Sequence, residues 1–249
     1  MRIFWIFLFC FALSSSLNSA IAQPVDTDMD VYYTTDRTVT MFNLTDTTRA
    51  YMHLKLREPV YVLKDRENGW KEVRTLDGAN GMVQSKLLSN VWIRISKTEQ
   101  TLFAYQGGKL VARIPTDLGY NFFADKERRG NAGDPDHWRT PEGQFFVVSK
   151  NPHSQFYKAF VLNYPNAEDA ERGLRDSIIT QVQYDAIVQA ERTVSMPLMN
   201  TELGGFIEIH GDGTGKRNNW TQGCIAIDNK ELDKLWDLIV VGTPVLIDP

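Results

Sequence analysis

The stretch "IHGDGTGKRNNWTQGCIAIDN" (residues 209–229) decides the fold around the most reactive side chains of this chain. Alternation in "GGFIEIH" (residues 204–210) and in "CIAID" (residues 224–228) predicts two strands, each with isoleucines on one face. If the two strands are neighbours, His210 and Cys224 share the opposite, exposed face. The segment between them, rich in glycine and asparagine, is then a loop beside a functional site.

A cysteine close to a histidine is a candidate nucleophile with its base. Cys224 is the only cysteine after residue 10, so if residues 1–22 are removed on export its thiol has no partner for an intramolecular disulfide. A thiol is mostly protonated at neutral pH, and the imidazole of His210 can take its proton. Gly223 lets the backbone come close to a substrate, so that main-chain N–H groups can form an oxyanion hole. The alternative is a buried thiol that acts as a small apolar side chain.

A metal site is the second chemistry that cysteine and histidine can support. Structural zinc takes four ligands, and the chain has no CxxC or HExxH motif and no paired histidines. His53, His137 and His153 are scattered along the sequence, which favours surface or hydrogen-bonded histidines. We therefore expect no metal ion and no organic cofactor.

Residues 1–22 are typical of a secretory signal peptide. Arg2 is the only charge, an apolar run follows, and "AIA" (residues 20–22) has the small-x-small cleavage pattern. Loss of Arg2 on cleavage changes the net charge from −4 to −5. This balance argues against nucleic acid or anionic lipid as the main partner, and no later stretch is long enough for stable membrane insertion. We expect a periplasmic protein.

Short β-rich runs separated by turns fill residues 31–90, which predicts a small β-barrel. This region resembles a bacterial SH3-like domain, through "GW" at residues 69–70 and "GMV" at residues 81–83. We expect it to dock on the rest of the chain or to bind wall polymer, with a plain spacer as the alternative.

Residues 91–249 are predicted to be β-rich with a few packed helices, so the whole chain is expected to be mainly β. A hairpin turns at residues 107–108. Thr180 and Gln183 have the spacing of a capping box that opens a helix to about Arg192. A second helix starts at Asp228.

Nearly all of residues 91–249 resemble the L,D-transpeptidase (YkuD-type) catalytic domain. The resemblance is carried by a His-Gly strand end, a loop and Thr-x-Gly-Cys, and by four further elements: "DLGYN" (residues 117–121), "RTPEGQF" (residues 139–145), "LNYPNAEDAERG" (residues 162–173) and "NTELGG" (residues 200–205). Gln222 stands where the family commonly has histidine, and Ala226 where it commonly has arginine or asparagine. Both departures resemble a branch with a Trp-Thr-x-Gly-Cys element.

The resemblance implies a mechanism on peptidoglycan stem peptides. Cys224 would attack the carbonyl at the L-centre of the diamino acid at stem position three and expel the terminal D-alanine. His210 would be the general base, with its ring oriented by the backbone carbonyl of Gly211. The amides of Gly223 and Cys224 would hold the oxyanion.

Six residues are expected to contact substrate: Thr221, Gln222, Asn219, Trp220, Tyr164 and Asn200. Packing of the loop is the alternative role for Trp220, and a structural role is the alternative for Tyr164 and Asn200. The helical insert between Tyr164 and Gly204 is expected to border the active site as a lid.

Three acyl acceptors fit this chemistry: the amine of a second stem, a lysine of an envelope protein, or water. They correspond to a cross-linking transpeptidase, a protein–wall ligase, and a carboxypeptidase or amidase. A non-catalytic wall-binding module is the alternative from a different class of protein.

Overall fold

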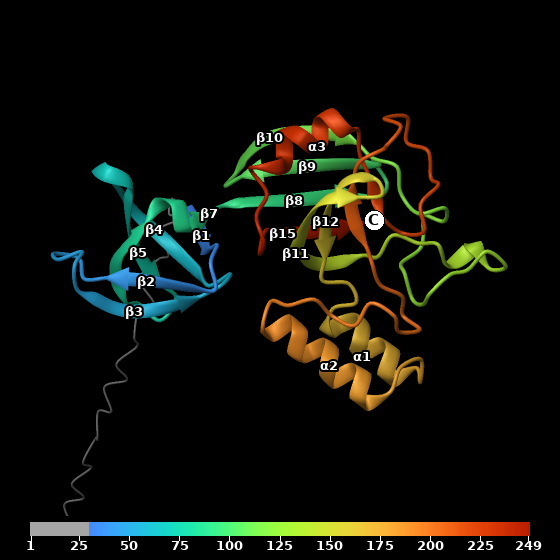
Figure 1. Cartoon of the computed structure of the whole chain (residues 1–249), viewed down its shortest axis with the longest axis horizontal. Helices are drawn as coiled ribbons and strands as arrows, with labels where there is room; N and C mark the ends of the chain where they lie inside the picture. Colours follow the sequence, from blue (N-terminus) through green and yellow to red (C-terminus); the bar gives the residue numbers. More distant parts are fainter. Residues whose placement is uncertain (1–29) are drawn as a thin grey trace, which may run out of the picture.

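The computed structural model describes residues 30–249 (Figure 1), so the predicted signal peptide lies outside the described residues. Two β-sheets follow each other along the chain, with three α-helices in the second half. Among residues 30–249, no helix combines the length and the apolar character needed to cross a bilayer. The expectation of a mainly β fold with a few packed helices is confirmed.

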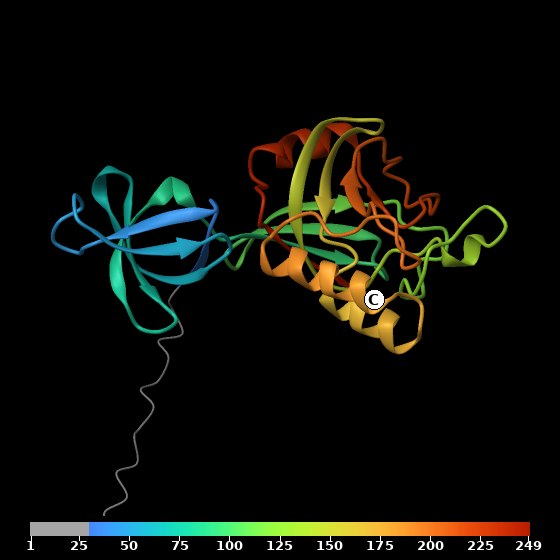
Figure 2. The ribbon, with the colours of Figure 1, turned by 60° about the horizontal axis from the view of Figure 1, so that its bottom comes forward.

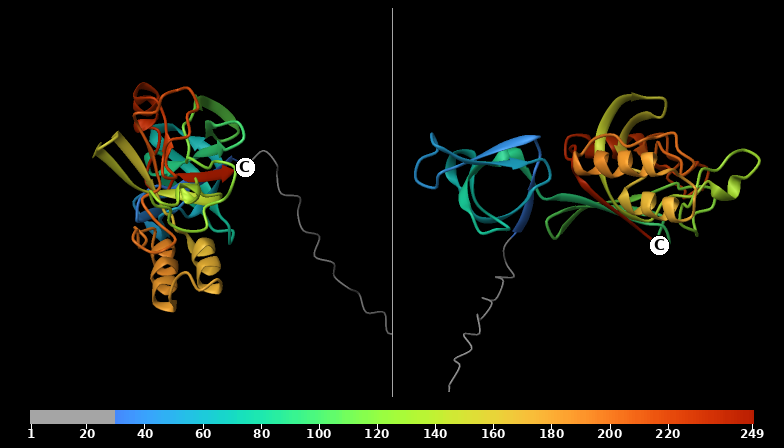
Figure 3. Two further views of the ribbon diagram at one scale, coloured as in Figure 1. Left: turned by 90° about the vertical axis from the view of Figure 1, so that its right-hand side faces the viewer. Right: turned by 90° about the horizontal axis from the view of Figure 1, so that it is seen from below.

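The N-terminal unit is a seven-stranded sheet in the order β3-β2-β6-β5-β4-β1-β7. Seen from below, it curls into a ring (Figure 3, right). Valines, leucines and Met41 fill its centre and form a core separate from that of the second unit. Its strands are β1 (Asp30–Thr34), β2 (Thr38–Phe42), β3 (Ala50–Lys55), β4 (Pro59–Arg66), β5 (Trp70–Thr75), β6 (Asn80–Gln84) and β7 (Leu88–Ser89), with 3-10 turns at Glu67–Gly69 and Ser85–Leu87.

The two units touch directly. The hydroxyl of Tyr33 donates to the backbone oxygen of Val91 at 2.8 Å and contacts Thr243 Oγ1 at 3.2 Å. On the same side, the guanidinium of Arg57 lies 3.8 Å from the ring centroid of Phe146. The N-terminal unit is therefore packed against the second sheet by polar and cation–π contacts.

The second unit is an eight-stranded sheet in the order β10-β9-β8-β15-β11-β12-β13-β14. The long strand β11 joins its two halves, because its first residues pair with β15 and its later residues pair with β12. The strands are β8 (Val91–Ser96), β9 (Thr101–Gln106), β10 (Lys109–Pro115), β11 (Gly143–Ser154), β12 (Tyr157–Leu162), β13 (Glu208–His210), β14 (Ile225–Ala226) and β15 (Pro244–Asp248), with a 3-10 turn at Pro135–His137. The hairpin at residues 107–108 connects β9 to β10, as predicted.

Strands β13 and β14 lie side by side and run parallel, with Ile209 opposite Ile225. Both isoleucines are fully buried in the core between the sheet and α3. This confirms that the two alternating stretches are neighbouring strands. It also explains why His210 and Cys224 line one cavity, although 14 residues separate them in the sequence.

Helices α1 (Ala167–Arg175) and α2 (Gln181–Arg192) form an antiparallel pair along one side of the second sheet (Figure 2). The predicted capping box is present, since the Thr180 side chain accepts from the Gln183 amide and the Gln183 side chain accepts from the Thr180 amide. Helix α3 (Asn229–Trp236) begins after Asp228, whose carboxylate accepts from the amide of Lys230. The predicted starts and the end of α2 agree with the structure.

Candidate active site

A cavity of about 630 Å³ opens where β13, β14 and three loops meet. His210 and Cys224 both line it, so the two predicted catalytic side chains share one wall of the site. The rest of the lining comes from residues 126–138, 155–156, 204–208 and 220–222. Apart from residues 220–222, which adjoin Cys224, three segments that are distant from it in the sequence supply the lining.

The thiol of Cys224 is partly buried and rests in its protonated form. Its Sγ donates to the backbone oxygen of Phe206 at 3.3 Å. Burial raises the pKa of Cys224 to about 12, because the charged thiolate loses hydration that the neutral thiol does not need. A thiolate at Cys224 would therefore require a base in the cavity to accept the proton.

His210 is held in one tautomer. Its Nδ1 lies 2.7 Å from the backbone oxygen of Gly211, and a carbonyl oxygen only accepts, so Nδ1 carries the hydrogen and Nε2 keeps a free lone pair. Burial lowers the pKa of His210, whose side chain is 1% exposed. The ring is a neutral imidazole with Nε2 as its basic atom. The hydrogen bond expected from Gly211 is present.

Two aromatic rings enclose this imidazole. Phe156 stacks on it with ring centroids 4.5 Å apart, and Trp220 meets it edge-on at 6.0 Å. Both rings also line the cavity. Phe156 was not singled out in the sequence, because it lies in a hairpin between β11 and β12 that carries no motif.

The turn before Cys224 has a conformation that requires glycine. Gly223 has a φ of 129°, and a Cβ there would lie 2.5 Å from the backbone oxygen of Arg139. The buried hydroxyl of Thr221 donates to the Cys224 carbonyl at 2.7 Å and accepts from the Gly223 amide at 3.2 Å. This contact corrects the expected oxyanion hole: the Gly223 amide is already bound, and of the two amides only that of Cys224 stays a candidate.

A buried carboxylate organises the loop between β13 and β14. Asp117 is 0% exposed, and its oxygens accept from the Thr214 amide at 2.6 Å and from the Thr214 hydroxyl at 2.9 Å. They also accept from the Asn218 amide at 2.8 Å and from Trp220 Nε1 at 3.0 Å. Asp117 therefore fixes the Trp220 ring beside His210. In the sequence, this position was notable only as the first residue of the "DLGYN" element.

Not all predicted substrate contacts agree with the structure. Trp220, Thr221 and Gln222 line the cavity, but the other three do not. Tyr164 is fully buried in the core and donates to the backbone oxygen of Leu203 at 2.8 Å, while the Asn219 side chain accepts from the Leu118 amide at 3.3 Å. Asn200 is exposed and outside the cavity wall. Tyr164 and Asn219 have structural contacts, and none of the three residues lines the cavity, which corrects the expectation of direct substrate contact.

The helical insert is placed differently from the expectation as well. Helices α1 and α2 pack on each other and on Leu203, and no residue from 165 to 203 lines the cavity. Lining begins at Gly204, after the chain has left the helices. The insert therefore does not line the cavity, as the expected lid would.

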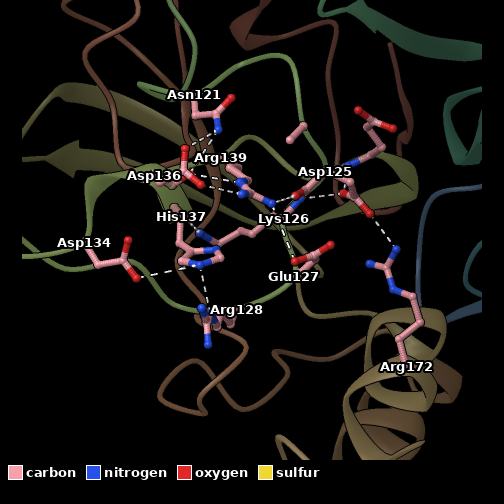
Figure 4. Close-up of polar contacts among 12 residues, drawn as sticks. Asn121, Asp125, Lys126, Glu127, Arg128, Asp134, Asp136, His137, Arg139 and Arg172 are labelled. Carbon is pink, nitrogen blue, oxygen red and sulfur yellow. Dashed lines mark hydrogen bonds and ion pairs between the residues drawn. The ribbon is translucent and has the colours of Figure 1, made fainter. Parts of the chain in front are cut away.

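Cations in the cavity wall were missed in the sequence. Lys126 and Arg129 both line the cavity. They belong to the run "DKERR" (residues 125–129), whose charges are typical of a solvated loop, and Figure 4 shows Lys126 among its charged neighbours. Lys126 is nevertheless only 4% exposed, and this burial lowers its pKa to about 8. Glu208 is the acidic side chain in the lining, and burial raises its pKa. Among residues 30–249, no group of three or more metal-ligating side chains is present.

Solved structures of L,D-transpeptidases show limited likeness to this chain. The structure of Bd1075 from Bdellovibrio bacteriovorus is 24% identical, with a TM-score of 0.40, over 64% of this chain and 48% of that one. An L,D-transpeptidase from Mycobacterium smegmatis is 15% identical, with a TM-score of 0.38, over 88% of this chain and 82% of that one.

Sequence comparison identifies the family. The candidate L,D-transpeptidase YafK of Escherichia coli (strain K12) is 23% identical over 207 residues, which are 80% of this chain. The match spans 56% of the length of YafK. The profile of the L,D-transpeptidase catalytic domain family, YkuD, matches residues 90–247, well over half of the chain. The chain therefore belongs to the L,D-transpeptidase (YkuD) catalytic domain family.

Proposed function

We propose that this protein is a periplasmic cysteine acyltransferase that acts on peptidoglycan stem peptides, with Cys224 as nucleophile and His210 as base. The observation that carries the proposal is the neutral imidazole of His210, whose Nδ1 is bound to Gly211 and whose Nε2 is free, in the same cavity as the thiol. Family membership supplies the class of substrate. Periplasmic location rests on the signal peptide predicted from residues 1–22.

In the first step, Nε2 of His210 takes the proton from Sγ while the sulfur attacks the carbonyl carbon of the diamino acid at its L-centre. The S–C bond forms, and the carbonyl electrons move to the oxygen, which the Cys224 amide stabilises as an oxyanion. The oxyanion then collapses, and the C–N bond to the terminal D-alanine breaks. The proton held by His210 goes to the departing amine, which leaves a thioacyl enzyme.

In the second step, an acceptor amine attacks the thioester, His210 removes its proton, and the thiol is restored. We propose the amine of another stem as the acceptor. Water or a lysine of an envelope protein competes for the same intermediate and yields a carboxylic acid or a protein–wall amide. The product therefore shows which acceptor was used: a cross-link between stems indicates a stem amine, a free carboxylic acid indicates water, and a protein–wall amide indicates a lysine.

Mass spectrometry of muropeptides, released from wall material after incubation with the purified protein, tests this function. The wild-type protein should release D-alanine and form cross-links between two diamino acids. Cys224→Ser should remain folded and lose at least about a thousandfold in turnover, since a hydroxyl is far harder for His210 to deprotonate. Wild-type turnover in the serine variant would show that Cys224 is not the nucleophile.

A separate measurement distinguishes an enzyme from a wall-binding module. The full chain is incubated with a carbapenem, and the intact mass is recorded. A covalent adduct that maps to Cys224 is expected, because the drug carries an acylating carbonyl. The absence of any adduct, together with unchanged muropeptides, would exclude acyl transfer and leave the binding module as the function.

A further inference from the structure

Lys126 is a buried cation without an ion-pair partner in the part of the chain that the structure describes. Its Nζ donates to the backbone oxygen of His137 at 3.2 Å, which uses one of its three N–H bonds. Only 4% of the residue is exposed, so water does little to solvate the charge. A buried charge in this condition is costly unless another group compensates it.

Three carboxylates close to Lys126 in the sequence pair with arginines (Figure 4), and the cavity's own acid, Glu208, has its pKa raised by burial, which favours its neutral form. Asp125 pairs with Arg172 at 2.5 Å, and Asp136 pairs with Arg139 at 2.7 Å. Glu127 lies 3.6 Å from Arg139 as well. These acids therefore pair with arginines and not with Lys126, so a negative charge for the Lys126 ammonium has to come from a molecule bound in the cavity.

A second donor in the same wall has no acceptor. The indole Nε1 of Trp138 is buried without a hydrogen-bond partner, and Trp138 lines the cavity together with Lys126. A side-chain donor that is buried and unpaired is uncommon in folded proteins. Lys126 and Trp138 are both lining residues of the cavity, and each has a donor that lacks an acceptor or a counter-charge. A carboxylate is the acceptor that would also supply the missing charge.

We propose that Lys126 and Trp138 form a subsite that binds a carboxylate of the acyl donor next to Cys224. This subsite rests on the proposed function, because it defines which stem peptides place their carbonyl at the thiol. Two carboxylates of the donor have the required chemistry. One is the terminal carboxylate of the D-alanine that leaves, and the other is the carboxylate at the D-centre of the diamino acid.

A different role for Lys126 has to be separated from this one. A thiolate at Cys224 would raise the pKa of Lys126, so the two groups are electrostatically linked. If Lys126 served only to stabilise the thiolate, its removal would slow alkylation of Cys224 by a neutral reagent. Such a role would not depend on whether the donor carries a carboxylate.

Isothermal titration calorimetry on the full chain carrying Cys224→Ala tests the subsite without turnover. Three soluble stem tetrapeptides are compared: the unmodified peptide, one with the terminal carboxylate as a primary amide, and one with the diamino-acid carboxylate as a primary amide. One amide form should bind at least about tenfold more weakly than the unmodified peptide, because it loses a charge-assisted contact. The form that weakens identifies which carboxylate is bound.

Lys126→Met in the same background should abolish this preference, since the apolar stem is kept and the charge is removed. Lys109→Met, an exposed lysine outside the cavity, is the matched control and should retain the preference. Equal binding of all three peptides to the Cys224→Ala protein would overturn the subsite, and this comparison requires no Lys126 variant to fold. A preference that persists in Lys126→Met would overturn it too, even if alkylation of Cys224 is slowed.

Failure of the proposed function gives a different result. D-alanine release is measured with wild-type protein, independently of the binding data. Loss of release with intact carboxylate preference would contradict the acyl transfer alone, whereas release without preference would contradict the subsite alone.

Discussion

At the scale of single residues, the protonated resting state of the Cys224 thiol predicts slow alkylation. Burial raises its pKa to about 12, so the thiolate fraction at pH 7 is about a thousandfold or more below that of an exposed cysteine. We expect iodoacetamide to alkylate the folded protein far more slowly than the unfolded protein at pH 7. We also expect the rate to keep rising with pH beyond pH 9, where an ordinary thiol levels off.

Intact-mass kinetics at several pH values measure this directly, with protein in denaturant as the reference. Because the raised pKa favours the neutral form, the folded protein should approach the reference only at strongly alkaline pH. A plateau of the folded-state rate near pH 8.5 would contradict the protonated resting state.

At the scale of elements, the loop of residues 211–220 depends on one carboxylate. Asp117→Asn replaces an acceptor oxygen by an amide nitrogen that faces donors, so some contacts to Thr214, Asn218 and Trp220 are lost. We expect a loss of about 2 kcal/mol in the free energy of unfolding and lower turnover, because Trp220 no longer holds its place beside His210.

Hydrogen exchange followed by mass spectrometry tests this effect locally. Peptides that cover residues 211–220 should exchange faster in Asp117→Asn, while those from β8 and β9 keep their wild-type rates. Asp237→Asn, an exposed carboxylate after α3, is the control and should leave the loop unchanged. Unaltered exchange in the loop of Asp117→Asn would show that this carboxylate does not organise it.

The same elements show what could be predicted from the sequence. Alternation of isoleucines was sufficient to place His210 at the end of one strand and Cys224 directly before the neighbouring strand, because a period of two is a local property of the chain. The capping box of α2 was predictable for the same reason. Lys126 and Asp117 were not, since a charged residue in a loop is normally solvated and only tertiary packing determines that these two are buried.

Substrate contacts were the least predictable part of the site. Tyr164 and Asn200 were assigned from motifs near the active-site elements, yet nearness along the chain does not determine which way a side chain points. The Tyr164 side chain points into the core, where the backbone oxygen of Leu203 accepts a hydrogen bond from its hydroxyl. Phe156 covers His210 from a hairpin without any recognisable pattern.

At the scale of the whole molecule, Tyr33 connects the two units. Tyr33→Phe removes the hydroxyl and leaves the Val91 carbonyl and Thr243 without this partner in a buried interface. We expect a loss of about 1–3 kcal/mol in the stability of the contact between the units, which should separate one unfolding transition into two.

Differential scanning calorimetry measures the transitions. Tyr51→Phe, which removes an exposed hydroxyl on β3, is the matched control and should behave as the wild type. A single transition at the wild-type temperature in Tyr33→Phe would mean that the hydroxyl contributes nothing to the docking of the units.

The short connection between the two sheets limits how they can move. Strand β7 ends at Ser89 and β8 begins at Val91, so Asn90 alone joins them. The backbone oxygen of Asn90 accepts from the amide of Gly107 in the next hairpin, at 2.9 Å. A single linker residue whose carbonyl is hydrogen-bonded does not allow free rotation of one unit relative to the other. If the first unit binds a glycan strand, as the sequence suggests, the strand would enter the cavity from one direction. The distance along the strand between the bound part and the cavity would then determine which stem peptide reaches Cys224.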